Sequence, residues 1–189
     1  MNKTLVEVSA RHMHLSKKDF EKLFGKNVEL TSIKMLSQPG EFASDFKATI
    51  LNGKRRIENV RILGPFRKKS QAEIALTDAY HLNLKPLPRI KVSGDLANTS
   101  KILVKGTKSS VKIPCIIAQR HLHCSDKEAK KLRLKNNQKI SIESGGIRKI
   151  TFHNAIVRVS KDYSLSLHLD TDEGNAAGIS GKTFGKIIK

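Results

Sequence analysis

The chain lacks the side chains and segments on which several classes of protein depend. Its 189 residues include no tryptophan, and phenylalanine and tyrosine together number nine (7 + 2). This composition argues against a base-stacking platform for single-stranded nucleic acid, which needs several aromatic rings. No apolar run reaches the about 18 residues of a membrane helix, and the opening MNKTLVEVSA has no apolar signal-peptide core. Two cysteines, Cys115 and Cys124, are too few for a disulfide framework. We therefore expect a cytoplasmic protein with reduced thiols and no membrane partner.

Acidic residues are also scarce. Lysine and arginine number 36 against 17 aspartates and glutamates, which gives a formal net charge of +19. Such a charge attracts polyanions, and a polyphosphorylated small molecule qualifies as well as a nucleic acid does. The basic residues are spread along the chain without an arginine-rich tail, so a nucleic-acid partner is not expected. The length suits one large domain or two small ones.

Histidine is rare, yet four of the seven histidines stand in two copies of one phrase, R-H-x-H-x-S. The copies are RHMHLS, which begins at Arg11, and RHLHCS, which begins at Arg120. The four histidines are His12, His14, His121 and His123. Residues i and i+2 share one face of a strand but lie about 200° apart around a helix, so each pair converges only on extended backbone. Paired neutral imidazoles suit zinc and similar ions. The alternative is ordinary surface histidines on half-exposed strands, which a matching repeat disfavours.

Each copy stands between an expected strand and an expected helix. Alternating strands over Thr4–Ala10 and Ile113–Gln119 lead into the two phrases. Ser16 and Ser125 then stand as N-caps of short amphipathic helices. Short β-segments fill most of the remaining chain, and the turn-rich LSQPGEFAS (Leu36–Ser44) interrupts them as a loop or lid would. Many short strands with few helices favour small barrels, so we predict a mainly β fold.

The two halves also align further along the chain. ENVRILGPF resembles NAIVRVSKD, an alignment that places Arg61 against Arg158. EIALTDA resembles HLDTDE with one residue of slippage, so Glu73 takes the place of His168. Each half then offers three ligands: His12, His14 and Glu73 in the first, and His121, His123 and His168 in the second. Three protein ligands with an open position are typical of catalytic zinc, whereas structural zinc is closed by four, usually with cysteine.

Other interpretations of these residues remain open. Cys124 follows the second histidine pair and could be a ligand or a nucleophile, whereas Cys115 is expected in the core. Asp170 and Asp172 could orient the histidines. A dinuclear metallohydrolase would use the same six ligands, but it normally needs several aspartates and a bridging group. A basic β-barrel nucleic-acid-binding protein would explain the charge but not the repeated histidines.

Four motifs carry a resemblance to a known family: VEVSARHMHLS, NVRILGPFRKKSQAEIALTDA, IIAQRHLHCS and HLDTDEGNAAGI. Over nearly the whole chain the sequence resembles the PduL-type phosphate acyltransferases (phosphate propanoyltransferase or phosphotransacylase). The resemblance implies an enzyme that transfers a propanoyl or acetyl group reversibly between coenzyme A and inorganic phosphate. It implies two zinc ions per chain, one on each triplet, and a catalytic, phosphate-binding role for Arg67. The implied coenzyme A contacts are Val8, Ser9, Ala10, Lys54, Arg61 and Asn175.

The resemblance further implies two small interleaved β-barrels, capped by short helices, in a homodimer. The expected first barrel comprises residues 1–10 and 119–189. The second spans 11–91, with a lid inserted at about 25–45, and 92–118 is a connection. Microcompartment members of the family carry an N-terminal encapsulation extension that is not seen here, so we expect a free cytosolic enzyme.

Overall fold

The fold is built from short strands in two compact units. The computed structural model describes residues 2–188, so the end residues 1 and 189 of the expected first barrel lie outside the described residues. Within that range the chain forms fourteen strands and four helices, and the predicted mainly β fold is confirmed. One unit, the discontinuous unit, takes the described residues up to Ala10 and from Gln119 onward; the other, the continuous unit, is Arg11–Ala118. None of the four helices in residues 2–188 has the length and apolar content needed to cross a membrane.

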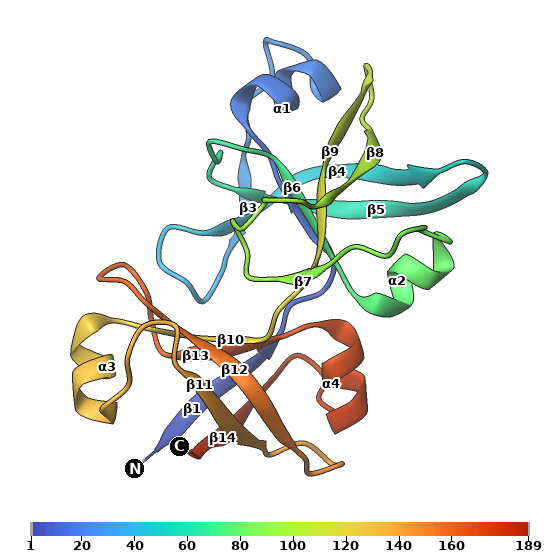
Figure 1. Ribbon diagram of the computed structural model, residues 1–189. Helices are drawn as coiled ribbons and strands as arrows, with labels where there is room; N and C mark the ends of the chain where they lie inside the picture. The colour runs from blue at the N-terminus through green and yellow to red at the C-terminus, as the bar shows by residue number, and fades with distance from the viewer. Residues whose placement is uncertain (1, 189) are drawn as a thin grey trace. The chain divides into compact units, whose positions relative to one another are not determined.

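The discontinuous unit is a closed barrel of six strands (Figure 1). Its strands are β1 (Lys3–Val8), β10 (His121–Cys124), β11 (Lys139–Ser144), β12 (Thr151–Val159), β13 (Ser166–Leu169) and β14 (Lys182–Ile188). Around the ring they follow the order β1, β13, β10, β12, β11 and β14, and β14 pairs back with β1. Two short helices, α3 (Asp126–Leu132) and α4 (Thr171–Ala177), lie on opposite sides of this barrel.

The continuous unit contains a second closed ring. Its elements are β2 (His12–His14), α1 (Lys17–Phe24), β3 (Ser32–Met35), β4 (Phe42–Asn52), β5 (Arg55–Gly64), β6 (Gln71–Ile74), α2 (Leu76–His81), β7 (Ile90–Lys91), β8 (Ser100–Lys105) and β9 (Ser110–Ala118). Six of the strands pair in the order β4, β5, β2, β6, β9 and β8, and β8 pairs back with β4. The strands β3 and β7 extend this sheet outside the ring.

The two rings have the same topology. If β2 is matched with β10, then β5, β4, β8, β9 and β6 correspond to β12, β11, β14, β1 and β13 in ring order. Each of the six pairings has the same parallel or antiparallel direction in both rings. The repeated sequence phrase is therefore accompanied by a repeated barrel.

The register corrects one detail of the sequence alignment. Arg61 lies opposite His12 on the neighbouring strand, whereas Arg158 lies opposite His123, so the two arginines are not equivalent. The matching residues are Asn59 and Asn154, which both adopt left-handed backbone with φ of 57° and 58°. Asparagine tolerates this conformation better than most residues, so each half can place an irregularity at the same level of its barrel.

Two segments of the continuous unit differ from expectation. Residues 92–118 were expected to connect the barrels, but they contain β8 and β9, which are two of the six strands of the ring. The sequence KILVKGTKSSVKIPCII alternates well enough to form a hairpin, and its apolar side chains Ile102, Val104 and Ile113 are buried. Within the expected lid at about 25–45, residues 32–35 form the exposed strand β3, so only part of this segment is loop.

Local sequence signals account for the helices that follow the two histidine pairs. The Ser16 hydroxyl accepts a hydrogen bond from the backbone N–H of Asp19, and α1 ends at Gly25 with φ of 112°. Ser125 and Glu128 form a reciprocal capping box at α3. The apolar faces of these helices pack into separate cores, one in each unit. The ends of β2 and β10 are thereby fixed beside a rigid helix.

Candidate metal centres and the surrounding site

The first triplet is assembled by two adjacent strands of the continuous unit. His12 and His14 alternate along β2, and antiparallel β6 places Glu73 directly opposite His12. The Nε2 atoms of His12 and His14 lie 3.7 and 3.8 Å from the same carboxylate oxygen, Oε1 of Glu73. All three residues are buried, and their three ligand atoms lie within 4.8 Å of one another. The structure thus brings together the three side chains that the sequence repeat paired.

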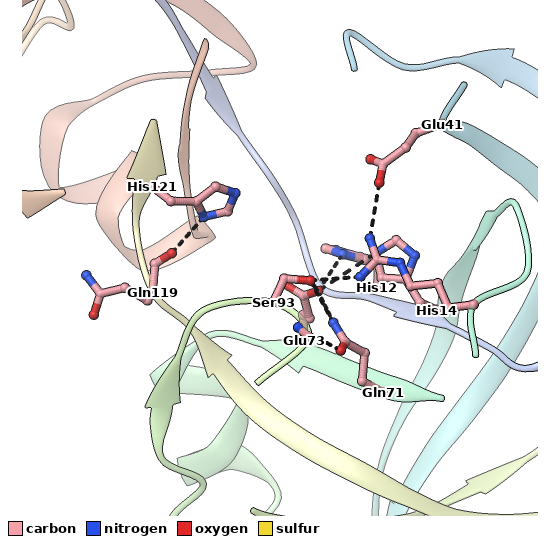
Figure 2. A network of polar contacts seen from close by, with 10 residues as sticks. His12, His14, Glu41, Gln71, Glu73, Ser93, Gln119 and His121 are labelled. Atoms are coloured by element: carbon pink, nitrogen blue, oxygen red, sulfur yellow. Dashed lines mark hydrogen bonds and ion pairs between the residues drawn. The ribbon is translucent and has the colours of Figure 1, made fainter. Parts of the chain in front are cut away.

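A hydrogen-bond network holds the carboxylate of this triplet (Figure 2). Oε1 of Glu73 accepts hydrogen bonds from Gln71 Nε2 at 2.5 Å and from Ser93 Oγ at 2.6 Å. Ser93 in turn accepts from Gln71 Nε2 at 2.8 Å and from Arg67 Nη1 at 2.9 Å. The other guanidinium nitrogen, Nη2, donates to Glu41 Oε1 at 3.1 Å. Ser93 therefore links the expected phosphate-binding arginine to the expected metal ligand.

Electrostatics favours the protonation states that metal binding requires. Burial alone would raise the pKa of Glu73, but the adjacent His12 and the further contacts with His14 and Ser93 hold that pKa well below its usual range. Burial, reinforced by His12 and Arg67, lowers the pKa of His14. An ionised carboxylate and neutral imidazoles are the forms that bind zinc. Among the described residues, Nδ1 of His14 is buried with no hydrogen-bond partner, so a polar atom of this cluster is left for a ligand.

The second triplet occupies the equivalent place in the discontinuous unit. His121 and His123 alternate along β10, and antiparallel β13 places His168 opposite His121, as β6 places Glu73 opposite His12. The ligand atoms of the three histidines lie within 4.8 Å of one another. Nδ1 of His121 contacts the carbonyl oxygen of Gln119 at 2.8 Å, so this nitrogen donates and Nε2 keeps its lone pair. The ring of Tyr163 stacks on His123 with centroids 4.1 Å apart.

Both donor sets fit zinc. Two imidazoles and a carboxylate, or three imidazoles, are common three-residue sets of zinc sites that keep a position open for substrate. The carbonyl of Gln119 behind His121, and Gln71 and Ser93 behind Glu73, are the kind of outer contacts that fix ligand orientation in such sites. Within residues 2–188, these six residues are therefore the metal-binding candidates.

The arginine before each histidine pair fixes a helix start. Arg11 Nη2 lies 2.8 Å from Asp78 Oδ1, and Arg120 Nε donates to Glu173 Oε1 at 2.5 Å. Asp78 and Glu173 are the third residues of α2 and α4, and each carboxylate also accepts from the N-cap backbone N–H. Asp170, which was a candidate for orienting histidines, is the N-cap of α4. The repeated phrase thus joins each metal strand to the helix that follows the third ligand.

The six expected coenzyme A positions divide between the units. Val8, Ser9, Ala10 and Asn175 belong to the discontinuous unit, and Lys54 and Arg61 to the continuous one. The start of α4 packs on β1, because a Cβ atom at Gly174 would lie only 2.5 Å from Val8 Cγ2. Lys54 stands in the turn between β4 and β5, seven residues from Arg61, which is roughly 23 Å along a strand. The two residues are therefore near opposite ends of the strand β5 and its preceding turn.

The cysteines pack in the apolar cores. Cys115 and Cys124 are both fully buried. Burial raises the pKa of Cys115 to about 12 and that of Cys124 to about 11, with smaller contributions from nearby carboxylates. A protonated, buried thiol is a poor nucleophile and a poor metal ligand. Cys115 is in the core as predicted, and the alternative role considered for Cys124 gains no support.

Comparison with known proteins places this site in a family. Residues 5–180 match the family model described as phosphate propanoyltransferase. The chain is 44% identical over 189 residues to a phosphate propanoyltransferase of Thermotoga maritima, covering 98% of this chain and 89% of the relative. It is 42% identical over 186 residues to the phosphate propanoyltransferase of Alkaliphilus metalliredigens, covering 97% of this chain and 87% of the relative. This match over most of both chains shows that the chain belongs to the phosphate propanoyltransferase family, an enzyme family of phosphate acyltransferases.

Proposed function

We propose that this enzyme transfers a short acyl group, propanoyl or acetyl, reversibly between coenzyme A and inorganic phosphate, with one zinc ion held by each triplet. The observation that supports this most directly is the arginine beside the first triplet. Arg67 is two-thirds buried, and Ser93 connects it to Glu73 by two hydrogen bonds. A fixed guanidinium next to a candidate metal centre is suited to an anion that must be oriented for reaction.

In this proposal the six ligands hold the metals, and other side chains bind the substrates. Bound zinc would supply Lewis acidity and would favour the thiolate form of a coordinated thiol. Arg67 grips inorganic phosphate through its planar fork and offsets the negative charge that builds up as an oxygen of phosphate approaches the thioester carbonyl. Ser93 holds the guanidinium on one side, so that the phosphate is presented in one orientation.

The charge of the chain suits coenzyme A, which carries several phosphate groups. With a net charge of +19, the chain attracts such an anion from solution. Lys54 and Arg61 are the proposed contacts to coenzyme A in the continuous unit. The Arg61 guanidinium donates one hydrogen bond to the carbonyl oxygen of Ser44 at 2.7 Å and keeps further donors for a ligand. Val8, Ser9, Ala10 and Asn175 complete the proposed set, and a homodimer is part of the same proposal.

A thiol-release assay tests the proposed function. The purified protein is given propanoyl-, acetyl- or butanoyl-coenzyme A, with and without inorganic phosphate, and its zinc content is measured on the same sample. We expect free thiol and acyl phosphate to form only when phosphate is present, in a sample with two zinc ions per chain. Thiol release without phosphate would instead indicate a hydrolase, and zinc-loaded protein with no release would overturn the proposal.

A further inference from the structure

A carboxylate that belongs to neither triplet lies beside the second one. Glu7 is on β1, which pairs in parallel with β13, and it lies directly opposite His168. Its Oε2 atom is 3.6 Å from Nε2 of His168, and its side chain is only 12% exposed. The other oxygen, Oε1, is 2.7 Å from Nζ of Lys182 on β14, the neighbouring strand on the other side. Glu7 is therefore held between a lysine and a candidate zinc ligand.

The first triplet has an apolar residue at this place. In the matched rings β1 corresponds to β9, and the residue opposite Glu73 is Ile116, which is fully buried. In the continuous unit the carboxylate is thus in the triplet and its neighbour is apolar. In the discontinuous unit the triplet has histidine and the neighbour is the carboxylate. Each half has one carboxylate at the same level of its barrel, on different strands.

This exchange has an electrostatic consequence. A divalent cation on two imidazoles and a carboxylate has one unit of its charge offset, whereas three neutral imidazoles offset none. Burying the larger charge without a counter-ion costs free energy, and a carboxylate in the next layer reduces that cost. Among the described residues, the potential ligand atoms that lie within 4.8 Å of one another at this cluster belong to the three histidines. Glu7 is therefore outside the ligand set.

We propose that Glu7 is the positioning residue of the second metal site: it orients His168 and supplies the negative charge that this triplet lacks. The role rests on the proposed function, in which that triplet binds zinc. The same ring atom, Nε2 of His168, also lies 3.0 Å from Ser166 Oγ, so two polar groups face this side of the ring. Lys182, which is 61% exposed, pairs with Oε1 of Glu7, and the other oxygen, Oε2, faces His168.

The test measures zinc affinity of the second site alone. The background variant is His12→Ala, which removes a ligand of the first site, so that the remaining zinc belongs to the second. Glu7→Gln is introduced into it, and Glu143→Gln is the matched control. The Glu143→Gln substitution removes the same unit of charge from the same barrel, but Glu143 pairs with the exposed Lys149 at 3.0 Å. Zinc is titrated against a chromophoric chelator, and the visible spectrum of the cobalt-substituted protein reports the ligand geometry.

We expect Glu7→Gln to weaken zinc binding by about 10- to 100-fold, the usual effect of losing an outer partner of a ligating histidine, and to shift the cobalt spectrum. Glu143→Gln should change the affinity less than about twofold. Glu7→Asp keeps the charge on a shorter side chain, so its zinc affinity should lie between those of Glu7→Gln and Glu143→Gln. It replaces Glu7→Gln in the test if thermal unfolding shows that Glu7→Gln does not fold. An unchanged affinity and spectrum in the folded Glu7 variant would overturn the role of Glu7 alone. A wild-type chain with no zinc in the second triplet would overturn the proposed function and this role together.

Discussion

The two barrels repeat the same six strand pairings, yet their candidate metal clusters are different. In the continuous unit, Glu73 receives hydrogen bonds from Gln71 and Ser93 and lies between two imidazoles. In the discontinuous unit, three histidines share the place, and Tyr163 stacks on one of them. The backbone that presents three ligands is common to both halves, and single side-chain changes at equivalent positions set the charge of each cluster.

The comparison also distinguishes Arg67, which has no arginine counterpart in the other barrel, from Arg11 and Arg120, which are equivalent to each other. The residue that matches Arg67, by the 95-residue offset between Glu73 and His168 (168 − 73), is Asp162, a residue of opposite charge. Arg11 and Arg120, in contrast, make the same contact in both halves. Among these arginines, the pair that both barrels share is therefore suited to a structural role, and Arg67, which has no arginine counterpart in the other barrel, is suited to a substrate. The four predictions below test this comparison of the two barrels.

The largest effect is expected from removing one ligand of either triplet. His12→Ala and His121→Ala should each lose about one zinc per chain while the other site keeps its metal. Acyl transfer should fall by at least about 100-fold in each, because a metal contributes several kcal/mol of charge stabilisation. Metal analysis and the thiol-release assay provide the measurements. The exposed His153 offers a control, since His153→Ala should change neither, and loss of both metals from one substitution would show that the sites are not independent.

Arg67→Lys should have the next largest effect. Ammonium keeps the charge but loses the planar fork, so the phosphate KM should rise and kcat fall, with a combined loss of roughly 2–4 kcal/mol in transition-state stabilisation. Zinc content should stay normal. Arg56→Lys, at an exposed ion pair with Glu58, is the control. Phosphate kinetics close to wild type would move the phosphate site away from Arg67.

Arg11→Gln and Arg120→Gln should lower stability by similar amounts. Each substitution removes an ion pair with the carboxylate at a helix start, and we expect a cost of about 1 kcal/mol, because both arginines are partly exposed to solvent. Urea unfolding of the two variants and of the double variant measures this. A large cost in one barrel and none in the other would contradict the structural equivalence of the two phrases.

The smallest effect concerns Glu41. Its carboxylate accepts a hydrogen bond from Nη2 of Arg67 at 3.1 Å and so occupies part of the guanidinium that we propose for phosphate. Glu41→Gln should release the guanidinium and lower the phosphate KM by about two- to fivefold. This matches the interaction energy of a partly exposed ion pair, which is about 0.2–1 kcal/mol. Steady-state kinetics at several phosphate concentrations measures this, with Glu58→Gln as the matched control. A higher KM would show that Glu41 helps to position Arg67 rather than competing with phosphate.

Much of the candidate site could be predicted because its residues follow local periodicity. Alternation along a strand placed each histidine pair on one face, and the repeat identified Glu73 and His168 as equivalents without any knowledge of strand pairing. Ser16 and Ser125 likewise predicted the starts of two helices, because serine is a favoured N-cap residue, and both caps are present in the structure.

Other contributors could not be predicted, because their neighbours are distant in sequence. Ser93 stands in a loop twenty residues after Glu73, and Glu41 precedes Arg67 by twenty-six. Glu7 is adjacent to His168 only because β1 closes the barrel against β13. Gln71 could have been found, since it lies two residues before Glu73 on the same strand face. The arginine alignment was wrong by two residues, because Arg61 is equivalent to Ile156 in the strand register, and the irregular backbone at Asn59 and Asn154 is not visible in a side-chain pattern.

The discontinuous barrel has a consequence for biosynthesis. Among the described residues, its first strand, β1, pairs with β13 and β14, which are synthesised after the whole of the continuous unit. All six strands of the other ring are complete once residue 118 has emerged. We expect the continuous unit to fold first and the N-terminal strand to wait for its partners, since domains generally fold as units during synthesis. Limited proteolysis of arrested nascent chains would show this order as early protection of residues 11–118 and late protection of β1. A circularly permuted chain that begins at residue 11 and carries β1 after β14 would remove the wait while keeping every strand pairing.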